Sequence, residues 1–167
     1  MDMNKIQAAI ITMSDSRSQS TEKADESGAV IKEILEANDY EVVHYELISD
    51  DLDGIKNSLI RVCDQNISLV LTTGGTGFSK RDITPEATKS VIEREALGIV
   101  EAIRFYSLQI TKRAMLSRAT SGIRQNTLII NLPGSPKACK EALDFVLDDV
   151  KHGIEILLGE AKECARK

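Results

Sequence analysis

The stretch that most restricts the fold of this chain is Leu69–Ala87, with the sequence LVLTTGGTGFSKRDITPEA. It begins with an apolar run typical of a buried strand and continues into the glycines Gly74, Gly75 and Gly77. It ends at Thr84-Pro85, where proline suits the first turn of a helix. Backbone N–H groups without neighbouring Cβ atoms can converge on an anion, and a helix N-terminus adds to the attraction. The stretch therefore predicts a strand, an anion-binding loop and a helix in direct succession.

Two apolar segments upstream of this stretch have the pattern of strands. The run IQAAIITM is almost continuously apolar, as expected of a strand buried on both faces, and EVVHYELI alternates. Segments with helical periodicity follow each of them. The expected elements are strands at Ile6–Met13, Glu41–Ile48 and Ser68–Thr73, and helices at Asp25–Asn38 and from a cap at Ser49–Asp51 or Asp53 to about Gln65. This βαβαβ order predicts a parallel sheet with right-handed crossovers.

The second half of the chain adds helices and a pair of strands. A turn at Arg124-Gln125-Asn126 joins two short apolar segments, which predicts a hairpin. The expected elements are helices at Thr84–Arg94, Gly98–Ile110, Lys137–Leu147 and Val150–Leu158, strands at Ala119–Ile123 and Thr127–Leu132, and a frayed C-terminal end. We therefore expect an α/β fold: a three-layer αβα sandwich with a mainly parallel sheet and a short antiparallel edge hairpin. Residues 1–167 are expected to form a single domain.

Ligands of a parallel sheet bind outside the carboxyl ends of the strands, where the connecting loops meet. The expected loops at these ends are Ser14–Ser20, Ser49–Asp51 and Gly74–Asp82. The candidate site residues among the acidic side chains of these loops are Asp15, Asp50 and Asp82. The predicted topology thus gathers carboxylates and the glycine loop on one rim of the sheet.

The amino-acid composition argues against two classes of binding partner. Hydrophobic residues make up 42% and charged residues 28% of the chain, which is typical of a folded globular protein. Aromatic residues are only 4%, without Trp, and the net charge is −5, so no nucleic-acid partner is expected. No apolar run approaches the roughly 20 residues of a membrane span, so no membrane partner is expected. Cys63, Cys139 and Cys164 lack CxxC spacing, and we expect reduced thiols in a cytoplasmic protein.

The glycine loop matches neither of two common nucleotide-binding patterns. A Walker loop requires Gly-Lys-Ser/Thr at its end, whereas Gly77 is followed by Phe78. A dinucleotide fingerprint requires a glycine at the position of Lys80. Phosphate binding is favoured over a tight structural turn, although spacing leaves both open. Lys80 and Arg81 either supply charge to an anion or form a solvated surface pair.

Other candidate residues also allow two interpretations. Asp50 and Asp82 can each serve as a helix cap or salt-bridge partner, but on one rim they can together hold Mg²⁺, which prefers hard oxygen ligands. Ser117-Arg118 is either a second anion contact or an ordinary loop. Pro133-Gly134-Ser135 is either a backbone anion site or a plain turn, and the turn is favoured.

Several of these segments together resemble one family. Thr72–Thr88, TTGGTGFSKRDITPEAT, is closely similar to the molybdenum cofactor biosynthesis family typified by Mog and the gephyrin G domain. The resemblance continues, in order and spacing, through ITMSD, LISDD, MLSR, GIR and LIINLPGS, and covers about Lys5–Leu158. Ser49 departs from the pattern, because many members have proline at this position.

The resemblance implies a molybdopterin adenylyltransferase, which uses ATP and Mg²⁺ to join AMP to the terminal phosphate of molybdopterin. Asp50 and Asp82 match the acidic positions linked to catalysis and metal binding. The matching substrate-binding positions are Asp15, Thr73, Gly74, Gly75, Thr76, Gly77, Ser117, Arg118, Pro133, Gly134 and Ser135. The resemblance also implies a homotrimer and handover of the product to a molybdate-insertion enzyme.

Two other functions differ from this one in testable ways. A non-catalytic, MoaB-like molybdopterin-binding or scaffold protein is the alternative within the same family. Arg81-Asp82-Ile83-Thr84-Pro85 retains the pattern of the active type, which favours the enzyme. A nucleotide-binding oxidoreductase is disfavoured because the dinucleotide fingerprint is missing.

Overall fold

The fold is built on a six-stranded sheet with the strand order β2-β1-β3-β6-β5-β4. The computed structural model describes residues 5–15 and 24–160. Its strands are β1 (Ile6–Met13), β2 (Tyr40–Ile48), β3 (Leu69–Thr73), β4 (Arg94–Glu95), β5 (Ser121–Arg124) and β6 (Thr127–Leu132). Neighbours among β2, β1, β3 and β6 are parallel, whereas β6, β5 and β4 pair antiparallel to one another.

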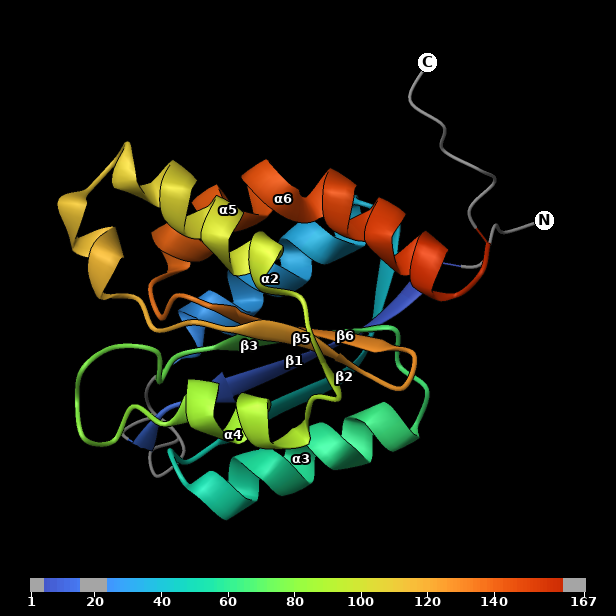
Figure 1. Cartoon of the computed structure of the whole chain (residues 1–167), viewed down its shortest axis with the longest axis horizontal. Coiled ribbons are helices and arrows are strands. Elements are labelled where there is room, and N and C mark those ends of the chain that lie inside the picture. Colours follow the sequence, from blue (N-terminus) through green and yellow to red (C-terminus); the bar gives the residue numbers. More distant parts are fainter. Residues whose placement is uncertain (1–4, 16–23, 161–167) are drawn as a thin grey trace.

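Helices cover both faces of this sheet. They are α2 (Glu26–Ala37), α3 (Leu52–Asp64), α4 (Thr84–Val91), α5 (Leu97–Leu108), the 3₁₀ helix η1 (Lys112–Leu116) and α6 (Pro136–Leu157). In Figure 1, α2, α5 and α6 form the upper layer, and α3 and α4 form the lower one. The three-layer αβα arrangement and the mainly parallel sheet expected from the sequence are confirmed.

The two faces of the sheet carry separate hydrophobic clusters, and β1 contributes to both. Ala8 and Ile10 pack in the cluster with α2, α5 and α6. Ala9 and Ile11 pack in the cluster with α3 and α4. All four side chains are fully buried, which explains why the strand is continuously apolar instead of alternating.

The helix expected at Thr84–Arg94 is too long, because it ends at Val91 and the next residues form β4. Ile92 already has an extended backbone, with φ −71° and ψ 148°. The N–H of Glu93 then donates to the carbonyl of Ile123 at 2.8 Å. Pairing with β5 satisfies backbone groups that a further helical turn would otherwise use. The antiparallel edge therefore has three strands, one more than the expected hairpin.

The two helices expected at Lys137–Leu147 and Val150–Leu158 are one continuous helix, α6. Its buried residues recur every three or four positions and form one stripe along the helix: Cys139, Ala142, Leu143, Val146, Leu147, Val150 and Ile154. The stripe spans Asp148 and Asp149, which are exposed. The acidic pair therefore marks the solvent face of one helix and not a break between two. The 3₁₀ helix η1 was also not expected from the sequence.

Some expectations concern residues outside the described part of the chain. These are the first loop beyond Asp15, Cys164 and the frayed C-terminal end. Within residues 5–15 and 24–160, no helix is both long and apolar enough to cross a membrane.

Asn131 links the sheet to its neighbours through a buried polar network. Its side-chain amide donates to the hydroxyls of Thr72 at 3.0 Å and Thr88 at 2.9 Å. Its carbonyl oxygen accepts from the N–H of Thr120 at 3.1 Å. The residue is 1% exposed, so water cannot replace these partners. One amide thus joins β6 to β3, α4 and the start of β5.

We expect Asn131→Ala to lower the free energy of unfolding by about 2–4 kcal/mol, because it leaves several buried polar groups without partners. Urea denaturation measures the change. Asn57→Ala, at an exposed position of α3, is the matched control and should stay within about 0.5 kcal/mol of the parent chain. Equal effects of the two substitutions would contradict the role of the network.

Candidate active site

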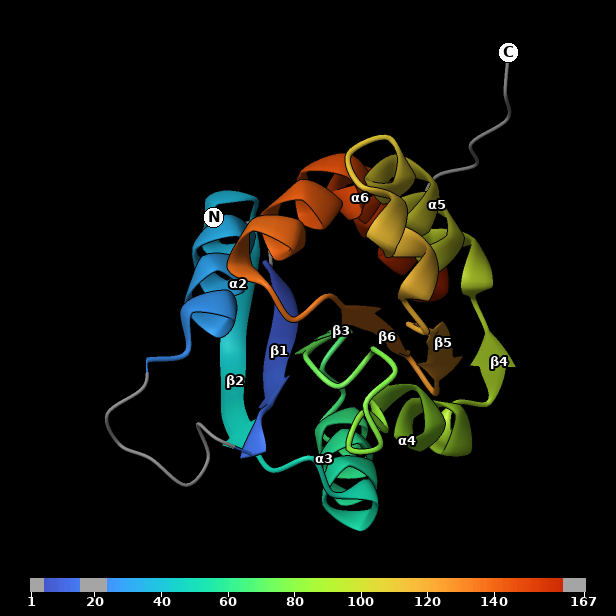
Figure 2. The ribbon, with the colours of Figure 1, turned by 90° about the vertical axis from the view of Figure 1, so that its left-hand side faces the viewer.

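The carboxyl ends of the parallel strands bring the predicted loops to one end of the sheet. In Figure 1 the loop between β3 and α4 lies at the left end of the sheet, below the connection that contains η1. Figure 2 looks onto this end and shows the same loop beside the segment that leads from β6 into α6. A Cβ atom added at Gly134 would lie 3.6 Å from the Cα of Gly74, so the two loops are in contact.

The glycine loop Gly74–Gly77 has all four of its carbonyl groups bonded to protein donors. In order, the carbonyls accept from the Thr84 hydroxyl (3.0 Å), the Thr84 N–H (3.1 Å), the Arg118 N–H (2.9 Å) and the Arg118 Nε (2.7 Å). Among the described residues, no group accepts a hydrogen bond from the N–H groups of Gly75, Thr76 or Gly77. The loop therefore keeps its donors for a ligand, which is the polarity of an anion site.

Two glycines of this loop adopt backbone conformations that side chains oppose. Gly74 has φ +94° and Gly75 has φ +66°. A Cβ atom at Gly74 would lie 2.4 Å from the carbonyl oxygen of Met13, and one at Gly75 would lie 2.3 Å from the Thr84 hydroxyl. Both left-handed φ and close approach thus require glycine here.

Asp15 and Asp50 hold each other in place across the ends of β1 and β2. The N–H of Asp50 donates to Oδ1 of Asp15 at 3.0 Å, and the N–H of Asp15 donates to Oδ2 of Asp50 at 3.2 Å. Arg81 Nε donates to Oδ2 of Asp15 at 2.7 Å. This hydrogen bond from Arg81, with that from the Asp50 N–H, lowers the pKa of Asp15. Asp15 therefore orients Asp50 and Arg81, and Arg81 is paired instead of being a free surface charge.

Asp50 has the environment of a cation ligand. Burial raises its pKa, and the charges of Asp15 and Asp82 add to this effect against the hydrogen bond from the Asp15 N–H and the charge of Arg81. Its Oδ1 is buried, and no described residue donates a hydrogen bond to it. A Cβ atom at Gly75 would lie 3.0 Å from this oxygen, so the glycine avoids crowding it. A hard cation would satisfy both the unpaired oxygen and the crowded negative charge.

Asp82 closes the turn that precedes α4. Its Oδ2 accepts from the N–H of Ser79 at 3.1 Å, and its own N–H donates to the Ser79 carbonyl at 3.0 Å. Asp82 is not the helix cap considered from the sequence, because Ile83 occupies that position without a side-chain cap. A Cβ atom at Gly77 would lie 2.9 Å from Oδ2 of Asp82, so the third glycine makes room for this carboxylate.

The acidic rim is not a preformed metal cage. Across residues 5–15 and 24–160, no three His, Cys, Asp or Glu side chains are grouped as metal ligands. Asp50 and Asp82 could still hold Mg²⁺ as a pair, since this ion often uses one or two carboxylates together with substrate phosphates and waters. The unpaired oxygen of Asp50 fits that use.

The second loop, Pro133-Gly134-Ser135, is fixed by Thr73, a predicted site residue, and by two residues that were not predicted to belong to the site. The Pro133 carbonyl accepts from the Thr73 hydroxyl at 2.6 Å and from the Cys139 thiol at 2.9 Å. The Gly134 carbonyl accepts from the Ser27 hydroxyl at 2.7 Å. The Thr73 side chain, expected to touch substrate, thus joins the two loops. Ser27 and Cys139 could be found only from the structure, because neither follows a motif assigned to the site.

An apolar pocket of about 310 Å³ opens beside the glycine loop. Its walls come from the loop, α5, η1 and the second loop, and include Thr76, Val100, Ile103, Leu116, Ser117 and Pro133. Arg104, Arg113 and Glu141 add charge to the lining. The site therefore combines an apolar wall for a ring system with a neighbouring anion loop and two carboxylates.

The predicted residues meet as expected at one end of the sheet, but several use their side chains on the protein itself. Ser117 lines the pocket, while its hydroxyl accepts from the N–H of Ala119 at 3.3 Å. Ser135 caps α6 by accepting from the N–H of Ala138 at 3.1 Å. Arg118 donates to carbonyls of the glycine loop, although the sequence suggested an anion contact or an ordinary loop.

Known proteins resemble this chain over most of its length. A family model described as a probable molybdopterin binding domain matches residues 9–152. Molybdopterin adenylyltransferase of Helicobacter pylori strain J99 is 41% identical over 169 aligned positions, which cover 99% of this chain and 95% of that protein. Molybdenum cofactor biosynthesis protein B of Staphylococcus aureus strain COL is 37% identical, covering 91% and 92% of the two chains.

Solved structures of this family have a similar fold. The crystal structure of the molybdopterin biosynthesis enzyme MoaB from Thermus thermophilus superposes with a TM-score of 0.87 at 39% sequence identity. The match covers 95% of this chain and 99% of that one. The likeness thus extends over the sheet, both helical layers and the loops at the rim.

We expect Gly74→Ala to lower the free energy of unfolding by about 2 kcal/mol or more, because its Cβ atom meets the Met13 carbonyl and its φ is left-handed. Gly98→Ala in α5 is the control, since its Cβ atom meets nothing within 4 Å. Chemical denaturation should show the control unchanged or more stable by up to about 1 kcal/mol. If both variants behaved alike, glycine would not be required at residue 74.

Proposed function

This chain belongs to the molybdopterin-binding family of molybdenum cofactor biosynthesis, and we propose that it is a molybdopterin adenylyltransferase. The reaction transfers AMP from ATP to the terminal phosphate of molybdopterin. An oxygen of that phosphate bonds to the α-phosphorus of ATP, and the bond from the α-phosphorus to the leaving pyrophosphate breaks. No covalent enzyme intermediate is needed, so the chain need not supply a nucleophile.

The observation that carries this proposal is the polarity of the loop Gly74–Gly77. Its four carbonyls are occupied by Thr84 and Arg118, while three of its N–H groups have no acceptor among the described residues. Such a loop can hold a phosphate without any positive side chain, which suits a protein of net charge −5. Transfer at phosphorus depends mainly on positioning and charge neutralisation, and this loop supplies both.

The other parts of the site take complementary roles in the proposal. The apolar pocket beside the loop accepts a ring of one substrate, so that its phosphate reaches the N–H groups of Gly75–Gly77. Asp15 orients Asp50 through the reciprocal hydrogen bonds at the rim. The turn between Ser79 and Asp82 keeps the second carboxylate at the mouth of the loop.

We propose that Asp50 holds Mg²⁺, with Asp82 as the second acidic group at this position. The buried, unpaired Oδ1 of Asp50 supports this assignment. When bound, the ion supplies charge neutralisation at the ATP phosphates.

A non-catalytic molybdopterin-binding protein is the second candidate. The 37% identity to biosynthesis protein B supports it, whereas the 41% identity to molybdopterin adenylyltransferase supports the transferase. The two candidates share the loop and the pocket and differ in whether pyrophosphate is released. An assay with molybdopterin, ATP and Mg²⁺ separates them.

The oligomeric state and the cellular location of the protein are proposals of the same kind. We propose a cytoplasmic homotrimer that hands adenylylated molybdopterin to a molybdate-insertion enzyme. Exposed apolar side chains on α5, η1 and α6, namely Phe105, Met115 and Phe145, support burial against another copy. Sedimentation of the purified protein measures its mass.

We expect Asp50→Asn to abolish AMP transfer while molybdopterin still binds, because the amide keeps the shape but loses the charge that holds a cation. Pyrophosphate release measures turnover, and ligand fluorescence measures binding. Asp53→Asn, in the exposed first turn of α3, is the control and should retain activity. A folded Asp50→Asn variant with full turnover would refute this assignment.

Removal of divalent cations tests the metal separately. We expect EDTA to stop pyrophosphate release and Mg²⁺ to restore it in the parent protein. The Asp50→Asn variant should release no pyrophosphate at any Mg²⁺ concentration. Unchanged turnover in EDTA would exclude a metal role for Asp50 while leaving the transferase proposal open to other tests.

A further inference from the structure

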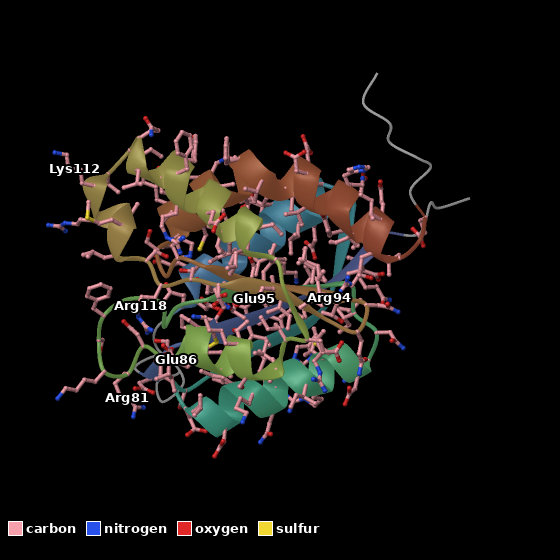
Figure 3. All side chains as sticks on the ribbon, in the orientation of Figure 1. Arg81, Glu86, Arg94, Glu95, Lys112 and Arg118 are labelled. Carbon is pink, nitrogen blue, oxygen red and sulfur yellow. The ribbon has the colours of Figure 1, made fainter. Side chains whose placement is uncertain are left out.

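Arg118 lies between η1 and β5 and makes an unusual set of contacts for a residue on a binding rim. Its N–H donates to the Thr76 carbonyl at 2.9 Å, and its Nε donates to the Gly77 carbonyl at 2.7 Å. The remaining nitrogens contact the Asp82 carbonyl and the Glu86 carboxylate. Figure 3 shows Arg118 directed toward Glu86 across the loop, with Arg81 further out at its edge.

These contacts fix a segment that is otherwise attached to the protein by the pair of Arg81 with Asp15. Between Gly77 and Ile83 the chain has no helix or strand. The turn bonds between Ser79 and Asp82 are local and do not attach the segment to the rest of the protein. Arg118 is 41 positions from Gly77 and 36 from Asp82, so its guanidinium is the tie between this segment and the opposite wall of the site.

Arg118 is also connected, through the residues that precede it in the chain, to the apolar pocket. Leu116 and Ser117, which directly precede it, line that pocket. The Ser117 carbonyl accepts from Nε of Arg104 in α5 at 3.3 Å, and a second nitrogen of Arg104 reaches the Ala119 carbonyl at 3.0 Å. The connection from η1 to β5 is therefore anchored to α5 on both sides of Arg118.

The chemistry of arginine suits this role better than it suits a phosphate contact here. A guanidinium is a rigid planar fork that can serve several acceptors in fixed directions, which an ammonium cannot do. Three of its nitrogens already face protein oxygens, and Glu86 offsets its charge. The guanidinium thus approaches the loop from the side of its carbonyl groups. The N–H groups that could hold a phosphate are those of the loop backbone.

We infer that Arg118 is a positioning residue that ties the Asp82 segment to the pocket wall, so that ring binding and carboxylate placement depend on each other. The inference rests on the proposed adenylyl transfer for its consequence in catalysis. The tie itself does not depend on which reaction the site performs. It assigns Arg118 a role other than direct contact with substrate phosphate.

The test compares backbone hydrogen exchange and kinetics in full-length Arg118→Lys, Glu86→Gln and Lys112→Ala. Lys112 lies on η1, is exposed, and points away from the loop in Figure 3, so it controls for loss of a nearby positive charge. Lysine keeps the charge of Arg118 but can replace only part of the fork. We expect Arg118→Lys to speed exchange of the hydrogen-bonded amides of Ser79, Arg81 and Asp82 by about tenfold or more, with the sheet unchanged.

Glu86→Gln removes one of the four contacts and should speed the same amides by a smaller factor, about twofold to fivefold. This variant provides the test if Arg118→Lys fails to fold. Lys112→Ala should exchange like the parent chain. Unchanged exchange of the Ser79, Arg81 and Asp82 amides in folded Arg118→Lys and in Glu86→Gln would overturn the inference.

Kinetics distinguish positioning from phosphate contact. We expect Arg118→Lys to lower kcat by about tenfold or more and to change the KM for ATP and molybdopterin by less than about threefold, because Asp82 is misplaced while charge is kept. A raised KM with unchanged kcat in Arg118→Lys would overturn the inference. If the parent protein released no pyrophosphate, the proposed function would fail, and faster exchange in Arg118→Lys would still support the tie.

Discussion

The parallel pairing of β1, β3 and β6 at the centre of the sheet is the constraint on which the rest of this structure depends. Thr12 pairs with Thr73 and Thr73 with Leu132, so three strands end at the same level. Each then turns into a loop on the same rim, where Asp15, the glycines and the second loop meet. Because helices bury both faces of the strands, the register cannot slip without exposing one of the two clusters.

An acidic chain can serve strongly anionic substrates because the site relies on backbone donors and not on a basic patch. The positive side chains near the loop are largely neutralised: Arg81 by Asp15, and Arg118 by Glu86 and carbonyls. What remains for a ligand is the set of N–H groups at Gly75–Gly77 and an acidic position suited to a cation. Fixed dipoles of this kind cost little reorganisation during reaction, which is the basis of electrostatic catalysis.

Polar groups remote in sequence give the rim its rigidity. Thr84, at the start of α4, holds two carbonyls of the glycine loop, and Thr73 and Ser27 hold the carbonyls of the second loop. Each of these hydrogen bonds satisfies a backbone group that would otherwise need water. Loops bonded in this way hold Gly74 and Gly75 at left-handed φ values, which glycine adopts without strain.

From the amino-acid sequence alone we could predict the βαβαβ core, the three-layer class, the glycine loop and the gathering of Asp15, Asp50 and Asp82 on one rim. Those conclusions depend on hydrophobic periodicity and on the direction of parallel strands, which are local signals. The tertiary structure was needed to show that Ile92–Glu95 leaves the helix to pair with β5, that α6 is continuous, and that Arg118 donates to carbonyl groups. These outcomes depend on partners tens of residues away, such as the 41 positions between Gly77 and Arg118, and a contact of that kind leaves no periodic trace in the sequence.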